Sequence, residues 1–300
     1  MKKVLFLLGP TAVGKTSFGV KLAQKLNGEI ISADSVQIFK GLDIGSAKVT
    51  KEEMQGVTHY GIDICSPQEE FSVFDFVEFT KKKIDEIIAK GKLPIVVGGT
   101  GLYIKALTLG YDFGNAKKDE KLRAKLENLA SEKGTQALFD MLKSLDEEEA
   151  KKIDKQNKVR LIRAIEIATN RGTKGQNVSD IDALVVGLVR DREKLYQSIN
   201  SRVDLMMKNG FEDEVKSLKE MGFSKENQCM RAIGYKEMLA YLDNEIDKER
   251  MIELTKQHSR NYAKRQLTFL RGMENVHFVD VEDKEKAFQN ILSLVESWNV

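Results

Sequence analysis

The chain has 300 residues, of which 41% are hydrophobic and 31% are charged, and its formal net charge is +2. This composition excludes a disordered chain, and no apolar run approaches the roughly 20 residues that span a bilayer, so we expect no membrane segment. So small a net charge neither favours nor excludes a nucleic-acid partner. Cys65 and Cys229 lack metal-binding spacing, and we expect both to be reduced in a cytoplasmic protein.

The first motif follows an apolar run at residues 4–8, which predicts a buried parallel strand. It fits the pattern GxxxxGK[ST] and consists of Gly9, Pro10, Thr11, Ala12, Val13, Gly14, Lys15 and Thr16. Apolar residues at helical spacing come next, and strand, loop and helix in this order are typical of a phosphate-binding P-loop. We therefore expect the backbone to bind a di- or triphosphate, Lys15 to reach its outer oxygens and Thr16 to ligate Mg²⁺.

A second short strand is expected at residues 29–34, where it ends in the carboxylate of Asp34. Ligands of open parallel sheets bind at the carboxyl ends of the strands, so Asp34 should face the P-loop. Further strands are predicted at residues 60–64 and 93–97, with an amphipathic helix at 73–90 between them and another helix after the second strand. This alternation predicts a parallel α/β sheet.

The character of the sequence changes near Gly114. Residues 117–171 are rich in charge, have a helical period and contain few strand-forming residues. Breaks between helices are expected at Gly134 and Asp146. We interpret this region as an all-helical insert.

The sheet is expected to resume after the insert, with strands at residues 183–189 and 276–280 and mostly helices at 192–271 between them. A final helix follows the last strand. The predicted fold class is therefore α/β, a P-loop NTPase-like parallel sheet flanked by helices, with a helical insert domain. The predicted domains are a catalytic core of residues 1–114 and 182–300 and an insert of residues 115–181.

The P-loop by itself leaves the reaction open. In the one candidate for a guanine-reading Asn-Lys-x-Asp motif, Arg160 stands where the aspartate is required. The strand at 93–97 does not end in the acidic residue that supports Mg²⁺ in motor-type ATPases. A small-molecule kinase with Asp34 as base remains an alternative, although nothing resembles its arginine-rich lid. A reaction in which diphosphate leaves, and Asp34 accepts a proton from the attacking nucleophile, fits better.

Six motifs then appear in order, and together they carry a resemblance to a known family. They are the P-loop, Ser-Ala-Asp-Ser-Val-Gln-Ile-Phe-Lys-Gly-Leu-Asp-Ile-Gly-Ser-Ala-Lys at 32–48, Val-Gly-Gly-Thr-Gly-Leu-Tyr at 97–103, Arg-Ala-Ile-Glu at 163–166, Ile-Gly-Tyr-Lys-Glu at 233–237 and Tyr-Ala-Lys-Arg-Gln at 262–266. From residue 4 to about residue 271 the chain resembles the bacterial tRNA isopentenyltransferases, the IPP transferase family of tRNA dimethylallyltransferases.

The resemblance implies transfer of a dimethylallyl group from dimethylallyl diphosphate to N6 of the adenosine 3′-adjacent to the anticodon of tRNA. It also implies Mg²⁺ as cofactor, and we expect a monomer. Three alternatives stay open: an adenylate isopentenyltransferase acting on free AMP, ADP or ATP, a P-loop small-molecule kinase, and a nucleotide-binding switch without catalysis. The basic insert and the Lys-Arg-Gln stretch favour tRNA, because a free nucleotide needs no such surface.

The resemblance also implies roles for single residues. Asp34 matches the general base, Thr100 a residue at the reaction centre, and Arg231 an arginine that grips the diphosphate with the P-loop residues Gly9, Thr11, Ala12, Val13, Gly14, Lys15 and Thr16. The target adenine should leave its stack to reach the site. The implied tRNA contacts are Asp34, Ser35, Val36, Gln37, Thr100, Arg123, Val159, Arg160, Leu161, Arg163, Lys264, Arg265 and Gln266.

Two basic clusters suit an RNA backbone. Lys256, Arg260 and Lys264 are spaced at i, i+4 and i+8 and should form one stripe on a helix. The second cluster is Lys158, Arg160 and Arg163 in the insert. Such runs are also typical of solvated helix faces, and it is the family resemblance that favours RNA. We assign no role to the histidines, His59, His258 and His277.

Overall fold

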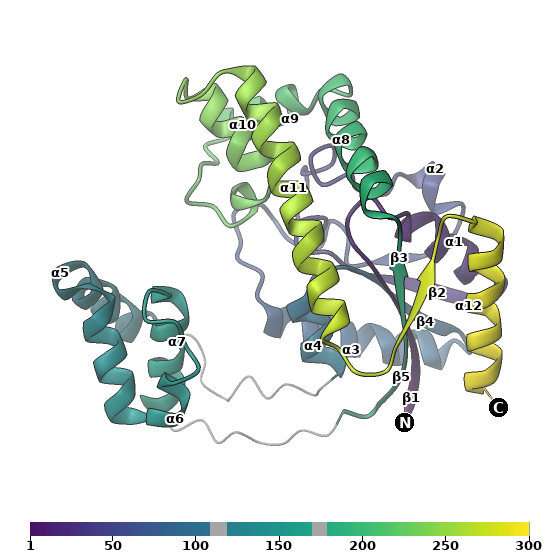
Figure 1. The fold of residues 1–300 in the computed structure, drawn as a ribbon, viewed down its shortest axis with the longest axis horizontal. Coiled ribbons are helices and arrows are strands. Elements are labelled where there is room, and N and C mark those ends of the chain that lie inside the picture. Colours follow the sequence, from purple (N-terminus) through teal and green to yellow (C-terminus); the bar gives the residue numbers. More distant parts are fainter. Residues whose placement is uncertain (109–118, 170–178, 300) are drawn as a thin grey trace. The chain divides into compact units, whose positions relative to one another are not determined.

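The computed structural model describes residues 1–108, 119–169 and 179–299 (Figure 1). The chain divides into one compact unit of Met1–Thr108 and Ser179–Val300 and a second of Leu109–Val178. The predicted boundary between residues 114 and 115 lies outside the described residues, and the one between 181 and 182 falls at the start of a strand. The predicted limits of the insert therefore stay a prediction.

The first unit is built on a six-stranded sheet in which every pair of neighbouring strands is parallel. In sheet order the strands are β3 (His59–Tyr60), β2 (Gly28–Ala33), β4 (Leu93–Gly98), β1 (Lys2–Leu8), β5 (Ile181–Val189) and β6 (Val276–Asp280). The ends of three central strands are in register, because Gly98 pairs with both Leu8 and Ala33. The loops that follow β1, β2 and β4 therefore meet at one edge of the sheet.

Helices cover both faces of this sheet (Figure 1). On one face lie α1 (Lys15–Lys25) and α12 (Lys284–Asn299), and on the other lie α3 (Val73–Ala89) and α4 (Gly101–Thr108). Strand β1 is buried on both sides, with Leu5 and Leu7 in one core cluster with Phe18 and Leu22 of α1. This burial explains the continuous apolar run of the strand.

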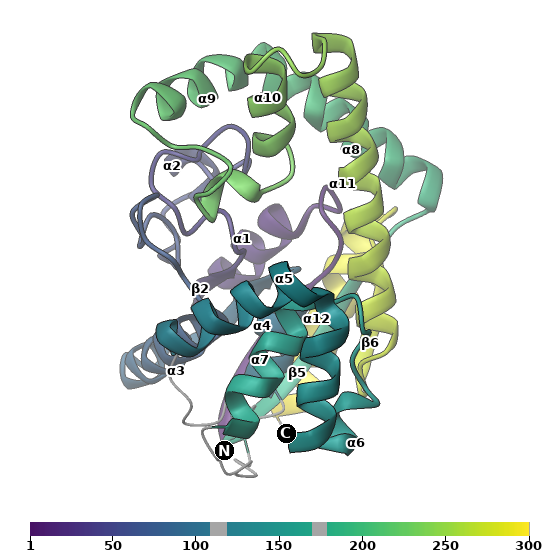
Figure 2. The ribbon, with the colours of Figure 1, turned by 90° about the vertical axis from the view of Figure 1, so that its left-hand side faces the viewer.

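Further helices stand above the carboxyl ends of the strands (Figures 1 and 2). They are α8 (Arg192–Lys208), α9 (Phe211–Glu220), the short 3₁₀ helix η1 (Cys229–Arg231), α10 (Tyr235–Leu242) and α11 (Lys248–Arg271), while α2 (Lys51–Met54) is one short turn. A second apolar core joins Phe211 and Tyr235 of these helices to Ile38, Phe39 and Leu42 of the chain after β2. The segment after β2 is thereby fixed against α9 and α10.

The second unit is helical, with α5 (Glu120–Leu145), α6 (Glu147–Ala150) and α7 (Lys158–Thr169) around a core of leucine and isoleucine. Gly134, at φ 77°, interrupts α5, and Asp146 ends α5 and caps α6 by accepting a hydrogen bond from the backbone N–H of Glu149. Both predicted breaks are confirmed. Within the described ranges, no helix of either unit combines the length and the apolar character that crossing a membrane requires.

One predicted strand is largely wrong. Residues 60–64 were expected to be extended, but β3 ends at Tyr60. Gly61, at φ 79°, and Asp63, at φ 54°, leave the β region and break the ladder. The backbone N–H groups of Asp63 and Ile64 instead donate to the carbonyls of Gln37 and Ile38. The other predicted strands are confirmed, with bounds that differ by up to two residues: β2 ends at Ala33, so Asp34 follows the strand instead of ending it.

Candidate functional site

The P-loop has the geometry of an anion-binding turn. Ala12 and Gly14 have positive φ values of 62° and 101°, which turn successive N–H groups toward one side of the loop. At Gly9 an added Cβ would lie 2.9 Å from Val13 Cγ1 and 3.0 Å from the carbonyl oxygen of Leu188, so a larger residue would push the loop off β5. Glycine is required at residue 9 by packing and at residue 14 by backbone conformation.

Helix α1 begins directly after this loop. Gly14 has no side chain to cap the helix, and the first turn of α1 has no acidic residue. The N–H groups and the dipole at the start of α1 therefore face the loop. The Lys15 ammonium donates to the carbonyl oxygens of Gly9 at 3.0 Å and Pro10 at 2.8 Å. Burial lowers the pKa of Lys15 to about 8, although Asp34 opposes this shift. The exposed Thr16 follows Lys15 on the same turn.

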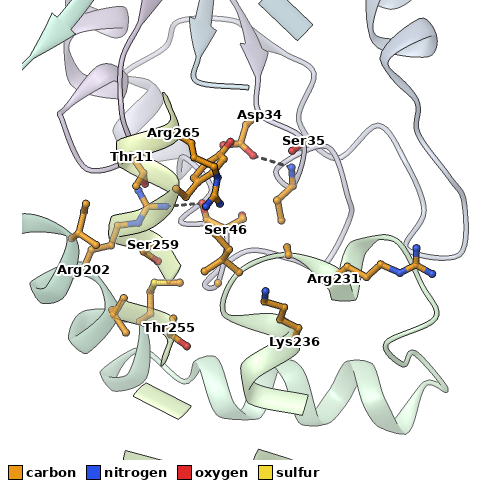
Figure 3. Close-up of a pocket in the computed structure, with 18 residues that line it drawn as sticks. Thr11, Asp34, Ser35, Ser46, Arg202, Arg231, Lys236, Thr255, Ser259 and Arg265 are labelled. Carbon is orange, nitrogen blue, oxygen red and sulfur yellow. Dashed lines mark hydrogen bonds between the residues drawn. The ribbon is translucent and has the colours of Figure 1, made fainter. Parts of the chain in front are cut away.

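Two cavities share a wall at the carboxyl edge of the sheet. The first, of about 250 Å³, is the P-loop cavity, and Lys15 and Thr16 line it. The second, of about 390 Å³, is the larger cavity, where α8 contributes apolar side chains and α10 and α11 contribute polar ones (Figure 3). The residues that line both are Thr11, Asp34, Arg202 and Tyr262.

Asp34 follows β2 directly, as its position in the sequence predicted. Its Oδ1 accepts a hydrogen bond from the backbone N–H of Val36 at 2.8 Å (Figure 3) and another from the backbone N–H of Gln37 at 3.3 Å. Within the part of the chain that the structure describes, both contacts use the same oxygen, so Oδ2 is the oxygen available for a proton. The carboxylate thus fixes the turn after β2 and still lines both cavities. Ser35 and Val36 lie on the larger cavity and Gln37 on the P-loop cavity.

Thr100 lies in the turn after β4 and begins α4. Its carbonyl oxygen accepts hydrogen bonds from the backbone N–H groups of Tyr103 and Ile104. Its side chain interacts with the phenol of Tyr262 on α11. Burial and the nearby Asp34 raise the pKa of Tyr262, and the hydrogen bond with Thr100 only partly offsets this rise. Tyr262 therefore stays protonated between Thr100 and the two cavities.

Arg202 is a site residue that the sequence analysis missed. It projects from α8 and donates a hydrogen bond to the carbonyl oxygen of Ser46 at 3.0 Å (Figure 3). Burial lowers its pKa, and Asp34 opposes that shift. No short motif surrounds this arginine, so its only sequence signal was a lone cation inside an amphipathic helix. A half-buried guanidinium beside a P-loop suits an anionic ligand.

Arg231, the arginine that was predicted to grip the diphosphate, is oriented differently. Its guanidinium donates to the carbonyl oxygens of Lys225 at 3.1 Å and Glu226 at 2.6 Å and points away from Asp34 (Figure 3). The residue is exposed and lies on the rim of the larger cavity. Its contact with diphosphate stays a prediction.

The predicted tRNA contacts on α11 have different surroundings. Lys264 and Arg265 are exposed, and the Arg265 guanidinium lies 5.6 Å from the centre of the Tyr262 ring. Gln266 is only 7% exposed. Its Oε1 accepts from the backbone N–H of Thr11 at 2.8 Å, and its Nε2 donates to the carbonyl oxygen of Gly99 at 3.1 Å. Its amide therefore connects the P-loop to the turn after β4.

The expected basic stripe on α11 is partly turned toward another helix. Lys256 pairs with Asp204 at 2.6 Å, and Arg260 donates to Asn200 Oδ1 at 2.7 Å, both partners lying on α8. These two cations hold α11 against α8. Of the three residues in the stripe, only Lys264 is exposed.

In the insert, the predicted tRNA contacts lie on two faces of α7 and on α5. Val159 is 75% exposed and Arg160 is also exposed, whereas Leu161 is fully buried in the core of the unit. Arg123 and Arg163 both bond to the carboxylate of Glu166, at 2.9 and 2.6 Å. Burial raises the pKa of Glu166, but the bonds from Arg123, Asp119 and Arg163 outweigh burial and hold this pKa below its usual range.

A P-loop at the carboxyl edge of a parallel sheet, followed by a helix N-terminus and bordered by half-buried cations, defines the class: the chain is a P-loop protein with an NTPase-like fold. A family model described as IPP transferase matches residues 37–273. The chain is 45% identical to the tRNA dimethylallyltransferase of Acetivibrio thermocellus, over 97% of this chain and 96% of that protein. It is 47% identical to the enzyme of the same name from Clostridioides difficile, over 95% and 94% of the two chains.

Solved structures give the same result. The full-length tRNA isopentenylpyrophosphate transferase of Bacillus halodurans is similar with a TM-score of 0.76 and 43% identity, covering 100% of this chain and 98% of that one. A eukaryotic dimethylallyltransferase acting on tRNA is similar with a TM-score of 0.85 and 29% identity, covering 98% of this chain and 77% of that one. This chain belongs to the IPP transferase family.

Proposed function

We propose that this protein transfers a dimethylallyl group from dimethylallyl diphosphate to N6 of the adenosine 3′-adjacent to the anticodon of tRNA, and releases diphosphate. Its family membership supports this function, because full-length relatives carry the name tRNA dimethylallyltransferase. The observation that carries the proposal is the shared wall: Asp34 and Arg202 line both the P-loop cavity and the larger cavity. A base and a cation at this boundary suit a group transfer between two substrates.

The P-loop cavity suits the diphosphate of the donor. The P-loop residues, Lys15 and Arg202 line it, and the positive φ values of Ala12 and Gly14 suit a loop whose N–H groups bind an anion. Each stabilises negative charge, and that charge increases on the leaving oxygen as the bond to carbon breaks. Ile199, Val203 and Met206 of α8 give the adjoining larger cavity an apolar side, which suits a short hydrocarbon group.

The reaction needs one bond made, one broken and one proton moved. The N6 lone pair attacks C1 of the dimethylallyl group, and the C1–O bond breaks with its electron pair left on diphosphate. The proton of N6 passes to the carboxylate of Asp34, whose Oδ1 is held by the turn while Oδ2 accepts the proton. Lys15 and Arg202 hold the departing diphosphate while this happens.

The residues present fit a magnesium ion. Mg²⁺ in phosphate-binding enzymes is held by one or two protein groups, with waters and phosphate oxygens as the other ligands. The Thr16 hydroxyl would ligate it, and Asp34 lines the same cavity. Within the described ranges there is no cluster of three or more His, Cys, Asp or Glu residues that would form an all-protein metal site. When bound, the ion would neutralise charge on the diphosphate oxygens.

The acceptor is a base within a folded RNA, so it has to leave its stack before N6 reaches Asp34. Ser35, Val36 and Gln37, which follow Asp34, contact the adenine in this proposal, together with Thr100. Exposed cations, Lys264 and Arg265 on α11 and Arg160 in the insert, contact the RNA backbone. Arg123, Val159, Arg163 and Gln266 stay predicted contacts; the side chain of Leu161 is fully buried in the core of the insert, so a contact there would be made by its backbone.

We also propose that the protein acts as a monomer in the cytoplasm. Cys65 and Cys229 are both free and buried, and burial raises the pKa of each thiol, so both stay protonated. Light scattering of the purified protein checks the mass, for which one chain of 33.9 kDa is expected.

One assay tests the proposed activity. Purified protein is incubated with dimethylallyl diphosphate and Mg²⁺, and with unmodified tRNA, AMP or ATP as acceptor. We expect the tRNA to gain the mass of one dimethylallyl group and the nucleotides to stay unchanged. Prenylation of AMP or ATP instead would indicate an adenylate isopentenyltransferase. Rapid hydrolysis of ATP without any prenylated product would refute the proposal.

A further inference from the structure

Glu214 on α9 makes a set of contacts that surface glutamates rarely make. Its carboxylate accepts four hydrogen bonds: from the backbone N–H groups of Asp43 at 2.9 Å, Ile44 at 2.6 Å and Gly45 at 3.1 Å, and from the hydroxyl of Tyr235 at 2.7 Å. Three of the donors are consecutive residues of one turn. A carboxylate that fills such a concave set of N–H groups holds the turn in one conformation.

The packing around Gly45 also holds the turn in one conformation. A Cβ added at Gly45 would lie 2.3 Å from Phe211 Cε2 and 2.6 Å from the ring of Tyr235, so the turn is pressed directly onto α9 and α10. Tyr235 is fully buried, and burial and the charge of Glu214 both raise its pKa. The phenol therefore stays protonated and donates a hydrogen bond to Glu214.

The turn leads directly to the site. The next residue, Ser46, accepts the hydrogen bond of Arg202 through its carbonyl oxygen at 3.0 Å (Figure 3). The Ser46 hydroxyl is itself buried and donates to the carbonyl oxygen of Leu42 at 2.6 Å. One peptide unit, the one between Gly45 and Ser46, thus separates the last N–H group held by Glu214 from the carbonyl group that holds the Arg202 guanidinium.

We propose that Glu214 is a positioning residue for diphosphate binding: by fixing the turn at residues 43–46 it holds Arg202 in place on the wall between the two cavities. The inference rests on the proposed function, in which Arg202 contacts the diphosphate. Glu214 itself lines neither cavity. Its loss should therefore weaken binding of the donor through Arg202 and leave the binding of tRNA unchanged.

The test measures binding of inorganic diphosphate with Mg²⁺ by calorimetry, and of tRNA by filter binding. Glu214→Gln keeps one oxygen for Gly45 and Tyr235, but its NH₂ group faces the N–H groups of Asp43 and Ile44 and accepts no hydrogen bond from them. We expect the Kd for diphosphate to rise about tenfold and the KM for the donor to rise with it. The Kd for tRNA should stay within about twofold. The matched control is Glu212→Gln on the same helix, because Glu212 pairs with Lys216 and Lys248 instead of with the turn, and no change is expected.

A double-mutant cycle separates positioning from general loosening. In an Arg202→Met background, Glu214→Gln should have little further effect on the Kd for diphosphate, because the group that it positions is gone. Additive losses in the cycle, or an equal loss of tRNA binding, would overturn the inference. If Glu214→Gln does not fold, Tyr235→Phe removes one of the four hydrogen bonds and should raise the same Kd less, again only when Arg202 is present.

The outcome is separable from that of the proposed function. Diphosphate binding needs no turnover, so the cycle gives its answer even if the protein proves to use another acceptor. Failure of prenyl transfer with an intact coupling between Glu214 and Arg202 would overturn the function alone. A wild-type protein that binds no diphosphate would overturn both.

Discussion

The backbone N–H of Thr11 donates a hydrogen bond to Oε1 of Gln266, which is 2.8 Å away in space and 255 residues away in sequence. The same amide donates from Nε2 to the carbonyl oxygen of Gly99 at 3.1 Å. One side chain of α11 therefore connects the P-loop, where the donor is expected, to the turn that carries Thr100, where the acceptor is expected. Movement of either loop is restrained by the other.

Replacing Gln266 with alanine tests this connection. The change removes the partner of the half-buried N–H of Thr11 and of the half-buried carbonyl of Gly99, at a cost of about 1 kcal/mol for each. We expect kcat/KM for the donor to fall about 10- to 100-fold, measured by steady-state kinetics. Thr268→Ala is the control, because Thr268 is exposed on the same helix and its hydroxyl donates a hydrogen bond to the backbone carbonyl oxygen of Lys264 in that helix. Equal rates for both variants would show that the connection is unimportant.

Asp34→Asn should separate the two roles of Asp34. Asparagine keeps an oxygen for the N–H groups of Val36 and Gln37, so the turn survives, but the amide cannot accept the N6 proton. We expect turnover to fall by about 10²–10⁴ while tRNA binding stays nearly unchanged. Asp34→Ala removes the turn contacts as well and should also weaken tRNA binding. Turnover near the wild-type rate in Asp34→Asn would refute the role of Asp34 as base.

Arg202 and Arg231 compete for the role of diphosphate ligand, and matched lysine variants decide between them. Lysine keeps the charge but loses the planar guanidinium. Arg202→Lys should raise the KM for dimethylallyl diphosphate about tenfold or more, because Arg202 lines both cavities. Arg231→Lys should raise it less, because that guanidinium bonds to backbone carbonyls away from Asp34. The reverse order would mean that Arg231 turns inward when the donor binds.

Charge removal on α11 tests the RNA surface. The double variant Lys264→Gln, Arg265→Gln should weaken tRNA binding and reduce the slope of log K against log salt by about 1–2, since two exposed cations are lost. Lys256→Gln, Arg260→Gln removes the same charge from the same helix, but these cations face α8. That control should lower thermal stability and change the salt slope less. Equal slopes in wild type and the first variant would exclude this surface.

Glu29 gives the core an acid-sensitive contact far from the site. It is buried on β2; burial opposes its ionisation, but hydrogen bonds from Lys92, Lys90 and Tyr60 lower its pKa to about 2. A lowered pKa stabilises the fold above the unfolded value of 4.5, and this contribution is lost as the pH falls from about 4.5 toward 2. Glu29→Gln should therefore cost about 2–3 kcal/mol at pH 7 and about half of that near pH 3, one unit above the folded pKa.

Urea unfolding at both pH values measures this difference, with the fluorescence of Trp298, the one tryptophan in the sequence, as the probe. Trp298 suits the purpose because its indole N–H bonds to Asp182 on β5, in the same sheet as Glu29. Glu86→Gln is the control, since Glu86 pairs only locally with Lys83 on α3. A loss of stability in Glu29→Gln that does not depend on pH would contradict the assignment.

The sequence alone was sufficient for the elements whose signals are local. The strand before the P-loop, the helix breaks at Gly134 and Asp146 and the position of Asp34 at the end of β2 follow from apolar runs, turn residues and spacing, and the structure has all of them. The six motifs were sufficient for the family. The strand at 60–64 was wrong because positive φ at Gly61 and Asp63 leaves only a weak trace in the sequence.

Tertiary structure decided which polar side chains face the substrates and which hold the protein together. Lys256, Arg260 and Lys264 look alike along α11, yet two of them pair with α8 and one reaches solvent. Gln266 connects two loops, and Arg202 belongs to the site without any motif. The physical reason is that helical spacing specifies a face of α11 or α8, whereas the partner on that face comes from residues up to 255 positions away.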